Sequence, residues 1–264
     1  MKMKNRWILA VALGCLAFHP LSVSMGAPEK NNSAQSALRG DSVSYDSTTG
    51  VLEAEGDVLL TQGETSIAGQ KAKYNTKTRQ GEIHGNVIAV REDLRMTSES
   101  AAIDGDNLSA TGSVHAVQRD MTLKADIVRT AGKNRYLAEG NVYGTQADKT
   151  FAGPVIDYDQ AGNYVLAASG GTITSVDGTF SANHMEGWFS ESRYKGVGNA
   201  HIVSPSRNFE GGGDVADYYG QADATGRARC ILDGNAWAYQ DNNFVSGNHL
   251  TLYLSNNTPV VENK

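Results

Sequence analysis

The sequence predicts an all-β protein built from repeated antiparallel hairpins, and three observations support this. Apolar residues alternate with polar ones, as at Leu52, Ala54, Val58 and Leu60, which is the period of a strand with one buried face. Turn-forming residues recur about every 14 residues. No comparable stretch after the first 26 residues has helical spacing. We expect an elongated structure of two sheets whose apolar faces are turned towards each other.

A glycine-centred tripeptide marks one strand of each repeat. The glycines follow one another at intervals of 27 to 36 residues, and repeats of this length indicate a structure that grows by adding one hairpin at a time. The set comprises Gly56-Asp57-Val58, Gly85-Asn86-Val87, Gly112-Ser113-Val114 and Gly140-Asn141-Val142, then more loosely Gly170-Gly171-Thr172, Gly198-Asn199-Ala200 and Gly234-Asn235-Ala236.

The position of these glycines has two interpretations. If they point inward with their apolar neighbours, they keep space open between the sheets, together with small residues such as Ala54 and Ala110. Alternatively, they mark bulges that twist the strands of an ordinary sandwich. The alternation of side chains does not distinguish these two cases.

A second pattern, offset from the first, marks the other strand of each repeat. It places a small or polar residue four positions before an aromatic or aliphatic one. The pairs are Asp41 with Tyr45, Gln70 with Tyr74, Glu99 with Ile103, Pro154 with Tyr158, and Asp214 with Tyr218.

The first 26 residues are typical of a secretory signal peptide. Lys2, Lys4 and Arg6 precede a run of 12 mainly apolar residues from Trp7 to Phe18, which is short for a membrane anchor. We therefore expect a cleaved signal peptide at 1–26, a flexible linker at 27–37, a β-jellyroll domain at 38–255 and a polar tail at 256–264. Cleavage would change the net charge from −6 to −9, which argues against nucleic acid as a partner.

The stretch "RGDSVSYDSTTGVLEAEGDVLLTQG" at 39–63, followed by "IAGQKAKYNTKTRQGEIHGNVIAV" at 67–90, resembles the LptA family, also called OstA-like, of periplasmic lipopolysaccharide-transport proteins. The family pattern is matched at Gly40-Asp41-Ser42-Val43-Ser44-Tyr45-Asp46 and more weakly at Gly247-Asn248-His249-Leu250. The resemblance extends over about 38–254. Residues Asn183 to Trp188, Gly211-Gly212-Gly213 and the long interval before Gly234 depart from it.

The resemblance implies an open, slightly twisted β-jellyroll with a groove between two sheets that holds the acyl chains of lipid A. It implies no enzymatic activity and no cofactor. The inward positions would line this groove: Leu52, Ala54, Val58, Leu60, Ile83, Val87, Ala89, Leu108, Ala110, Val114, Ala138 and Val142.

The resemblance also implies a location in the periplasm and three kinds of partner. These are lipopolysaccharide itself, the inner-membrane transport complex, and the jellyroll domain of the outer-membrane translocon. Because open sheet edges recruit further strands, we expect head-to-tail self-association through two edges formed by Asp41, Val43 and Tyr45 and by Leu250, Leu252 and Leu254.

The sequence leaves three alternative functions open. They are an LptC-like component anchored in the inner membrane if residues 7–27 are retained, a polysaccharide-active enzyme, and a structural β-repeat protein with a filled core. His84, His115, His184, His201 and His249 lack metal-ligand spacing, so we assign no metal site. Cys230 shares its parity with Leu232, Gly234 and Ala236, which predicts a buried, unreactive thiol.

Overall fold

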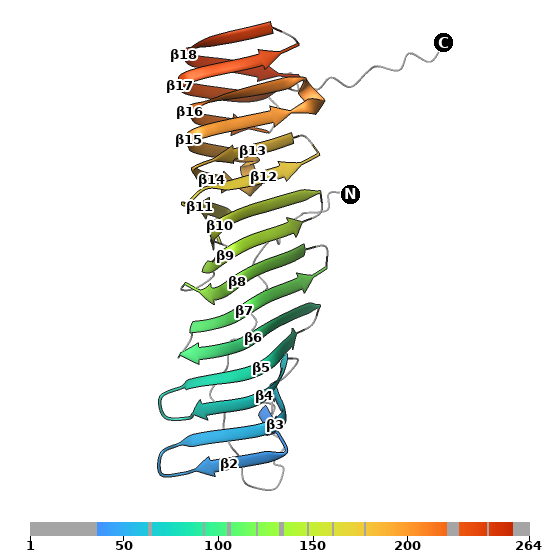
Figure 1. The fold of residues 1–264 in the computed structure, drawn as a ribbon, viewed down its shortest axis with the longest axis vertical. Coiled ribbons are helices and arrows are strands. Elements are labelled where there is room, and N and C mark those ends of the chain that lie inside the picture. Colours follow the sequence, from blue (N-terminus) through green and yellow to red (C-terminus); the bar gives the residue numbers. More distant parts are fainter. Residues whose placement is uncertain are drawn as a thin grey trace, which may run out of the picture. The chain divides into compact units, whose positions relative to one another are not determined.

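A computed structural model describes residues 36–62, 65–91, 93–104, 107–119, 121–131, 135–146, 148–159, 161–176, 178–220, 227–241 and 243–255. The chain divides into two compact units, residues 1–139 (unit 1) and 140–264 (unit 2). Strands and short turns make up the described residues, with no α-helix among them (Figure 1). The prediction of an all-β fold of antiparallel hairpins is confirmed. The predicted signal peptide and polar tail lie outside the described residues.

Unit 1 is a series of antiparallel strands in which each pairs with the next along the chain. Consecutive strands from β2 to β8 are hydrogen-bonded to each other. They are β2 (Ser42–Asp46), β3 (Val51–Gln62), β4 (Thr65–Asn75), β5 (Gln80–Arg91), β6 (Leu94–Asp104), β7 (Asn107–Gln118) and β8 (Met121–Thr130). The short strand β1 (Ser36–Arg39) pairs with the second half of β3, opposite Leu59–Gln62. Strand β9 (Arg135–Gln146) contains the boundary between the units.

Unit 2 repeats the same plan with shorter strands at its start. The strands are β10 (Lys149–Asp159), β11 (Tyr164–Ala167), β12 (Gly171–Ser175), β13 (Gly178–Ala182), β14 (His184–Trp188), β15 (Arg193–Ser204), β16 (Phe209–Tyr219), β17 (Ala228–Gln240) and β18 (Asn243–Leu254). Two 3₁₀ turns, η1 (Phe189–Glu191) and η2 (Pro205–Arg207), connect β14 to β15 and β15 to β16. Strands β13 and β14 pair with the two halves of β15, just as β1 and β2 pair with the two halves of β3.

The repeated glycines form β-bulges near the middle of the long strands. Gly56 has φ +73° and Asp57 φ +43°, and the pairing of β3 with β4 shifts between Glu55 and Val58. The same pair of left-handed residues occurs at Gly85, Gly112, Gly140, Gly198 and Gly234 and the residue after each. A bulge adds one residue to a strand and bends it. Of the two interpretations of these glycines, the structure confirms the bulge.

The side chain that would occupy the glycine position comes from the neighbouring strand. A Cβ atom on Gly56 would lie 2.2 Å from Asp41 Oδ2, and one on Gly112 would lie 2.5 Å from Glu99 Oε2. Gln70, Asn183 and Asp214 cover Gly85, Gly198 and Gly234 in the same way. Because Asp41, Glu99 and their equivalents are exposed, the glycines do not line the interior. The idea that they hold a groove open is wrong.

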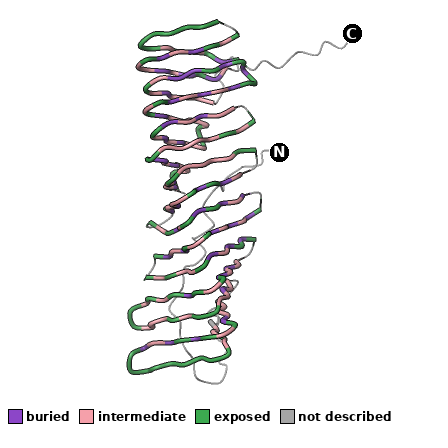
Figure 2. Tube along the Cα trace, in the orientation of Figure 1, coloured by how far each residue is buried: buried purple, intermediate pink, exposed green. Residues whose placement is uncertain are grey.

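Alternation of buried and exposed residues follows the prediction along the strands. In β5, Ile83, Val87 and Ala89 are buried while Glu82, His84 and Asn86 are exposed. Figure 2 shows exposed residues at turns such as that between β2 and β3, and buried ones within the strands. Burial of these apolar side chains therefore stabilises the packing of the two halves of each bent strand against each other.

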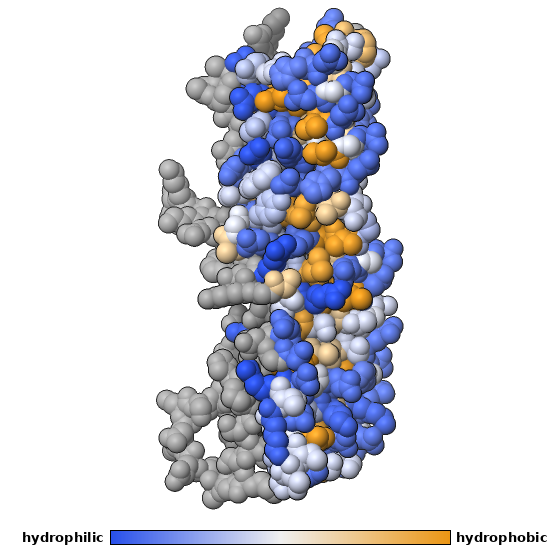
Figure 3. All heavy atoms as spheres, turned by 90° about the vertical axis from the view of Figure 1, so that its left-hand side faces the viewer, coloured by the Kyte–Doolittle hydropathy of each residue, from blue (hydrophilic) through white to orange (hydrophobic). Residues whose placement is uncertain are grey.

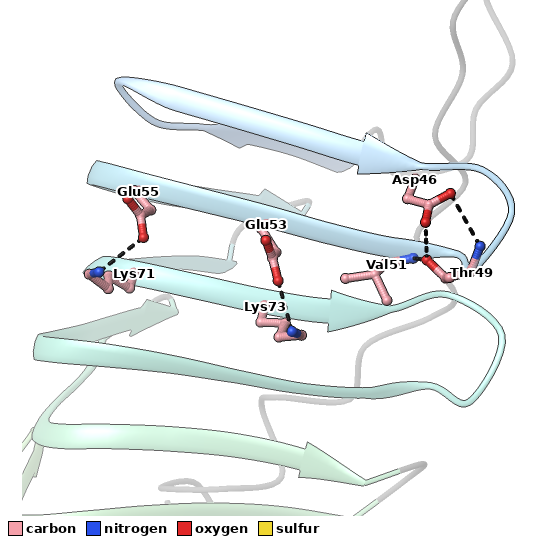
Figure 4. Close-up of polar contacts among 7 residues, drawn as sticks. All are labelled: Asp46, Thr49, Val51, Glu53, Glu55, Lys71 and Lys73. Carbon is pink, nitrogen blue, oxygen red and sulfur yellow. Dashed lines mark hydrogen bonds and ion pairs between the residues drawn. The ribbon is translucent and has the colours of Figure 1, made fainter.

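The outer face of unit 1 carries ion pairs between neighbouring strands. Lys71 Nζ lies 2.9 Å from Glu55 Oε1 and Lys73 Nζ lies 2.7 Å from Glu53 Oε1 (Figure 4). The hydrogen bond and the charge of Glu53 raise the pKa of Lys73 above its ordinary value. All four side chains are more than half exposed, so these pairs add little stability.

Candidate functional site

An apolar pocket lies in the interior of unit 1. It encloses about 70 Å³ and is formed by β1 and by β3 to β7. The lining residues are Leu38, Leu52, Leu60, Ile67, Ala72, Lys73, Tyr74, Gly81, Glu82, Ile83, Ala101, Ala102, Ile103, Leu108 and Ser109. Since the ammonium group of Lys73 pairs with Glu53 on the outer face, the pocket is lined chiefly by carbon atoms. Such a lining favours hydrocarbon over any polar ligand.

Four of the predicted groove residues line this pocket: Leu52, Leu60, Ile83 and Leu108. Six others in unit 1 are buried but do not reach it, namely Ala54, Val58, Val87, Ala89, Ala110 and Val114. Their exposed fractions are 5% or less, so they form the tightly packed centre near the bulges. Ala138 and Val142, both on β9, are also buried.

The alternation in the glycine-containing strands did not reveal five further apolar residues of the lining. Ile67, Ala72 and Tyr74 come from β4, and Ala101 and Ile103 from β6. A signal for two of them was present in the offset sequence pattern, which pairs Gln70 with Tyr74 and Glu99 with Ile103. Gln70 covers Gly85 and Glu99 covers Gly112. Tyr74 and Ile103, the second residues of these pairs, line the pocket.

The pocket is small compared with a whole acyl chain. Its enclosed volume is about half of the roughly 150 Å³ in which benzene binds inside a protein. Several lining side chains, including Leu60, Tyr74 and Ile103, are only half-buried. A long chain would therefore extend beyond the enclosed space along these half-buried side chains. Figure 3 shows one face of the chain, on which patches of hydrophobic residues lie between hydrophilic ones.

The interior of unit 2 is filled differently, by aromatic side chains. Tyr158, Phe180 and Phe209 are buried there, and Tyr194 lies between Phe180 and Tyr218, at ring-centre distances of 6.3 and 6.4 Å. Burial raises the pKa of the Tyr194 phenol. The two spaces described within this unit enclose only about 50 and 20 Å³. Unit 1 is therefore the better candidate for binding a hydrocarbon chain.

Each unit also has a strand whose outer edge is unpaired among the described residues of that unit. These are β2 in unit 1 and β18 in unit 2. Of the predicted edge contacts, Val43 and Tyr45 are 48% and 43% exposed, and Leu250 and Leu252 are half-buried. Leu254 is fully buried, and Asp41 covers Gly56. An added strand would thus meet the backbone of β18 rather than the side chain of Leu254.

The titratable side chains in the described residues are mostly paired at the surface. His201 Nε2 lies 3.0 Å from Glu210 Oε1, and His249 Nδ1 lies 2.6 Å from Asp233 Oδ1. No group of three potential metal ligands occurs in the part of the chain that the structure describes. No helix among these residues is long and apolar enough to cross a bilayer.

Cys230 is a free, fully buried cysteine on β17. Desolvation by burial, with a smaller contribution from the charge of Asp217, raises the pKa of its thiol to about 12. The prediction of a small buried residue at this position is confirmed.

Residues 67–164 match the family described as "LptA/(LptD N-terminal domain) LPS transport protein". The matched segment makes up 98 of the 264 residues of the chain. It contains β4 to β7, which supply most of the pocket lining, so the LptA resemblance seen in the sequence is confirmed there.

Among solved structures, this chain is similar to LptH, "the LptA homologous periplasmic component of the conserved lipopolysaccharide transport device from Pseudomonas aeruginosa". The identity is 19%, with 48% of this chain and 77% of that chain covered. The TM-score is 0.25, and we base no argument on that similarity. No curated protein matches the sequence.

Proposed function

We propose that this protein is exported to the periplasm and carries lipopolysaccharide between the inner and outer membranes, with acyl chains held in the interior of unit 1. The apolar pocket between β1 and β7 is the observation that carries the proposal. The LptA-type match over 67–164 supports it, because this segment includes most of the pocket-forming strands.

The energetics explain why a carrier needs such a lining. Each buried methylene is stabilised by about 0.8 kcal/mol, so a chain of about 12 carbons would cost roughly 10 kcal/mol if it were exposed to water. Side chains such as Leu60, Tyr74 and Ile103 offer apolar surface to that chain. The saccharide and phosphate groups could stay in water, so an acidic protein need not attract them by its overall charge.

The unpaired edges of β2 and β18 suit a carrier that acts as one link of a bridge. Their free backbone N–H and C=O groups can pair with a strand from another protein. We propose that they bind the jellyroll domains of the inner-membrane complex and the outer-membrane translocon, or a second copy of this chain. The exposed side chains of Val43 and Tyr45 would be covered in such a contact.

Two neighbouring residues of β3 provide a direct test. Leu60 lines the pocket, whereas the next residue, Thr61, is not among the lining residues. Leu60→Asp should weaken the binding of purified lipopolysaccharide at least tenfold, because a carboxylate would enter the hydrocarbon site. Thr61→Asp, the matched control, should leave the affinity within about twofold. Circular dichroism would verify that both variants are folded.

Equal affinities for the two variants would overturn the proposal. So would a loss of binding in both variants while their circular dichroism spectra match that of the original protein.

A further inference from the structure

A single row of aromatic and arginine side chains crosses six strands on the outer face of unit 2. Adjacent members are directly opposite each other in the strand register: Tyr164 with Trp188, Trp188 with Arg193, Arg193 with Tyr219, Tyr219 with Arg229, and Arg229 with Tyr253. We call these six residues the arginine–aromatic row. Several of their neighbours in sequence, namely Val165, Ala228, Cys230 and Leu254, face the interior and are buried.

From Tyr164 to Arg229, successive side chains of the row lie close to one another. The ring centres of Tyr164 and Trp188 are 5.3 Å apart. The guanidinium carbon of Arg193 lies 4.6 Å from the Trp188 ring and 5.3 Å from the Tyr219 ring. That of Arg229 lies 4.4 Å from the Tyr219 ring. The three guanidinium–ring distances are within the range of cation–π interaction.

The charges along the row are unequally compensated. Arg193 Nη2 donates a hydrogen bond of 3.1 Å to Asp217 Oδ1, so its charge is neutralised within the protein. Arg229 is exposed and has no ion pair with any residue in the described part of the chain. Near it, Arg227 lies over the ring of Tyr253 at 4.9 Å. Arg229 therefore places a positive charge without an ion-pair partner among the described residues at the β17 end of the row.

The position of the Arg229 guanidinium over the Tyr219 ring determines what this site can bind. A guanidinium that lies flat on an aromatic ring keeps its N–H edges free, and these edges fit the two oxygens of a phosphate or carboxylate. The exposed ring of Tyr253, 50% accessible, offers an apolar face beside them. Aromatic faces with adjacent hydrogen-bond donors can accommodate a sugar ring that carries an anionic group.

We propose that the arginine–aromatic row binds a phosphorylated saccharide, with Arg229 holding the phosphate and Tyr253 contacting the sugar. This site lies on the outer face of unit 2 and does not depend on the hydrocarbon pocket of unit 1. The sugar phosphate could belong to the headgroup of a lipid or could be a free metabolite, and the experiment distinguishes these two sources.

The experiment follows the indole N–H resonance of Trp188 by NMR while glucose 1-phosphate is added to the full chain. Trp237, which packs against His201 at a ring distance of 5.8 Å, is not part of the row and serves as an internal control. We expect a saturable shift for Trp188, a much smaller shift for Trp237, and weaker binding of glucose and of inorganic phosphate given separately.

Arg229→Gln should weaken the binding of glucose 1-phosphate about tenfold or more, because it removes a charge-assisted hydrogen bond. Arg95→Gln is the matched control, since Arg95 is an exposed arginine on β6 that lies opposite Val90 and Val117 rather than aromatic rings. It should leave the affinity unchanged, as should Leu60→Asp in the pocket of unit 1.

Tighter binding of the deacylated saccharide of lipopolysaccharide than of glucose 1-phosphate would identify a lipid headgroup as the source. The reverse order would identify a free sugar phosphate. The proposal is overturned if glucose 1-phosphate gives no saturable shift, or if Arg229→Gln binds it as well as the original chain. In either case the row only stabilises the sheet.

Discussion

The side chain of Gln70 on β4 occupies the space where a side chain of Gly85 on β5 would lie. A Cβ atom on Gly85 would be 2.8 Å from the Cβ and 2.9 Å from the Cγ of Gln70, and the φ of Gly85 is +87°. These two facts explain why glycine recurs once per hairpin: it allows the bulge that bends each strand, while the neighbouring strand covers the bend.

Gly85→Ala should therefore destabilise the protein. A left-handed conformation at a residue other than glycine costs about 1–3 kcal/mol, and the contact with Gln70 adds to this. Gly247→Ala on β18 is the matched control, because a Cβ there would meet nothing closer than 3.8 Å and its φ is not left-handed. Urea unfolding followed by circular dichroism should show a loss for Gly85→Ala and a change within about 0.5 kcal/mol for Gly247→Ala. Equal effects would contradict this explanation of the bulge.

The thiol of Cys230 should resist alkylation in the folded protein. Its pKa is raised to about 12 by burial, so at pH 8 almost none of it is the reactive thiolate. Iodoacetamide followed by peptide mapping should modify Cys230 in urea and leave it unmodified under native conditions. Comparable labelling rates in both conditions would show that the interior of unit 2 opens readily.

The turn between β2 and β3 should contain a carboxyl group of low pKa. Thr49 Oγ1 donates a hydrogen bond of 2.7 Å to Asp46 Oδ2 (Figure 4). The backbone N–H of Thr48 donates one of 2.8 Å to Asp46 Oδ1. The Thr49 hydroxyl is the largest of the causes that lower the pKa of Asp46 below 3.8. Thr49→Val should raise this pKa, as measured by the carboxyl chemical shift in an NMR titration.

This lowered pKa determines how the contribution of Asp46 to folding stability changes with pH. The contribution of Asp46 to folding is present above the pKa of the unfolded chain and is lost as the pH falls through the folded pKa. Thr48→Val keeps the backbone N–H donor and should therefore have the smaller effect on the Asp46 pKa. A larger effect of Thr48→Val than of Thr49→Val would contradict the assignment of the hydroxyl as the main cause.

Self-association through the two sheet edges can be tested with paired cysteines. Val43 on β2 and Val245 on β18 are 48% and 44% exposed. A chain carrying both Val43→Cys and Val245→Cys should give a ladder of disulfide-linked oligomers on mild oxidation. Val176→Cys paired with Val43→Cys is the control, since Val176 is 76% exposed but lies outside the edge strands. Monomers alone at high concentration, or equal ladders from both pairs, would argue against edge pairing.

The strands and their inward faces could be predicted from the sequence because a period of two places Ile83, Val87 and Ala89 on one face. The role of the glycines could not be predicted from the sequence. Alternation assigns Gly85 to the same face as Ile83 and Val87, and only the backbone angles show that the residue sits in a bulge under Gln70.

Four residues of the pocket lining could be predicted from the sequence, for a related reason. Leu52, Leu60, Ile83 and Leu108 come from strands with clear alternation. Tyr74 and Ile103 come from strands in which the inward positions change parity, from Ile67 to Ala72 in β4 and from Met96 to Ala101 in β6. The arginine–aromatic row was missed altogether, because its successive members are up to 26 residues apart in sequence and meet only through the strand register.

The central claim is that lipopolysaccharide acyl chains contact the interior of unit 1, and site-specific photo-crosslinking in cells tests it most directly. The probe would replace Leu60, which lines the pocket, or Glu53, whose carboxylate pairs with Lys73 on the outer face. We predict that the probe at 60 captures lipopolysaccharide and that the probe at 53 does not. Equal capture at both positions, or capture at position 53 alone, would contradict the account.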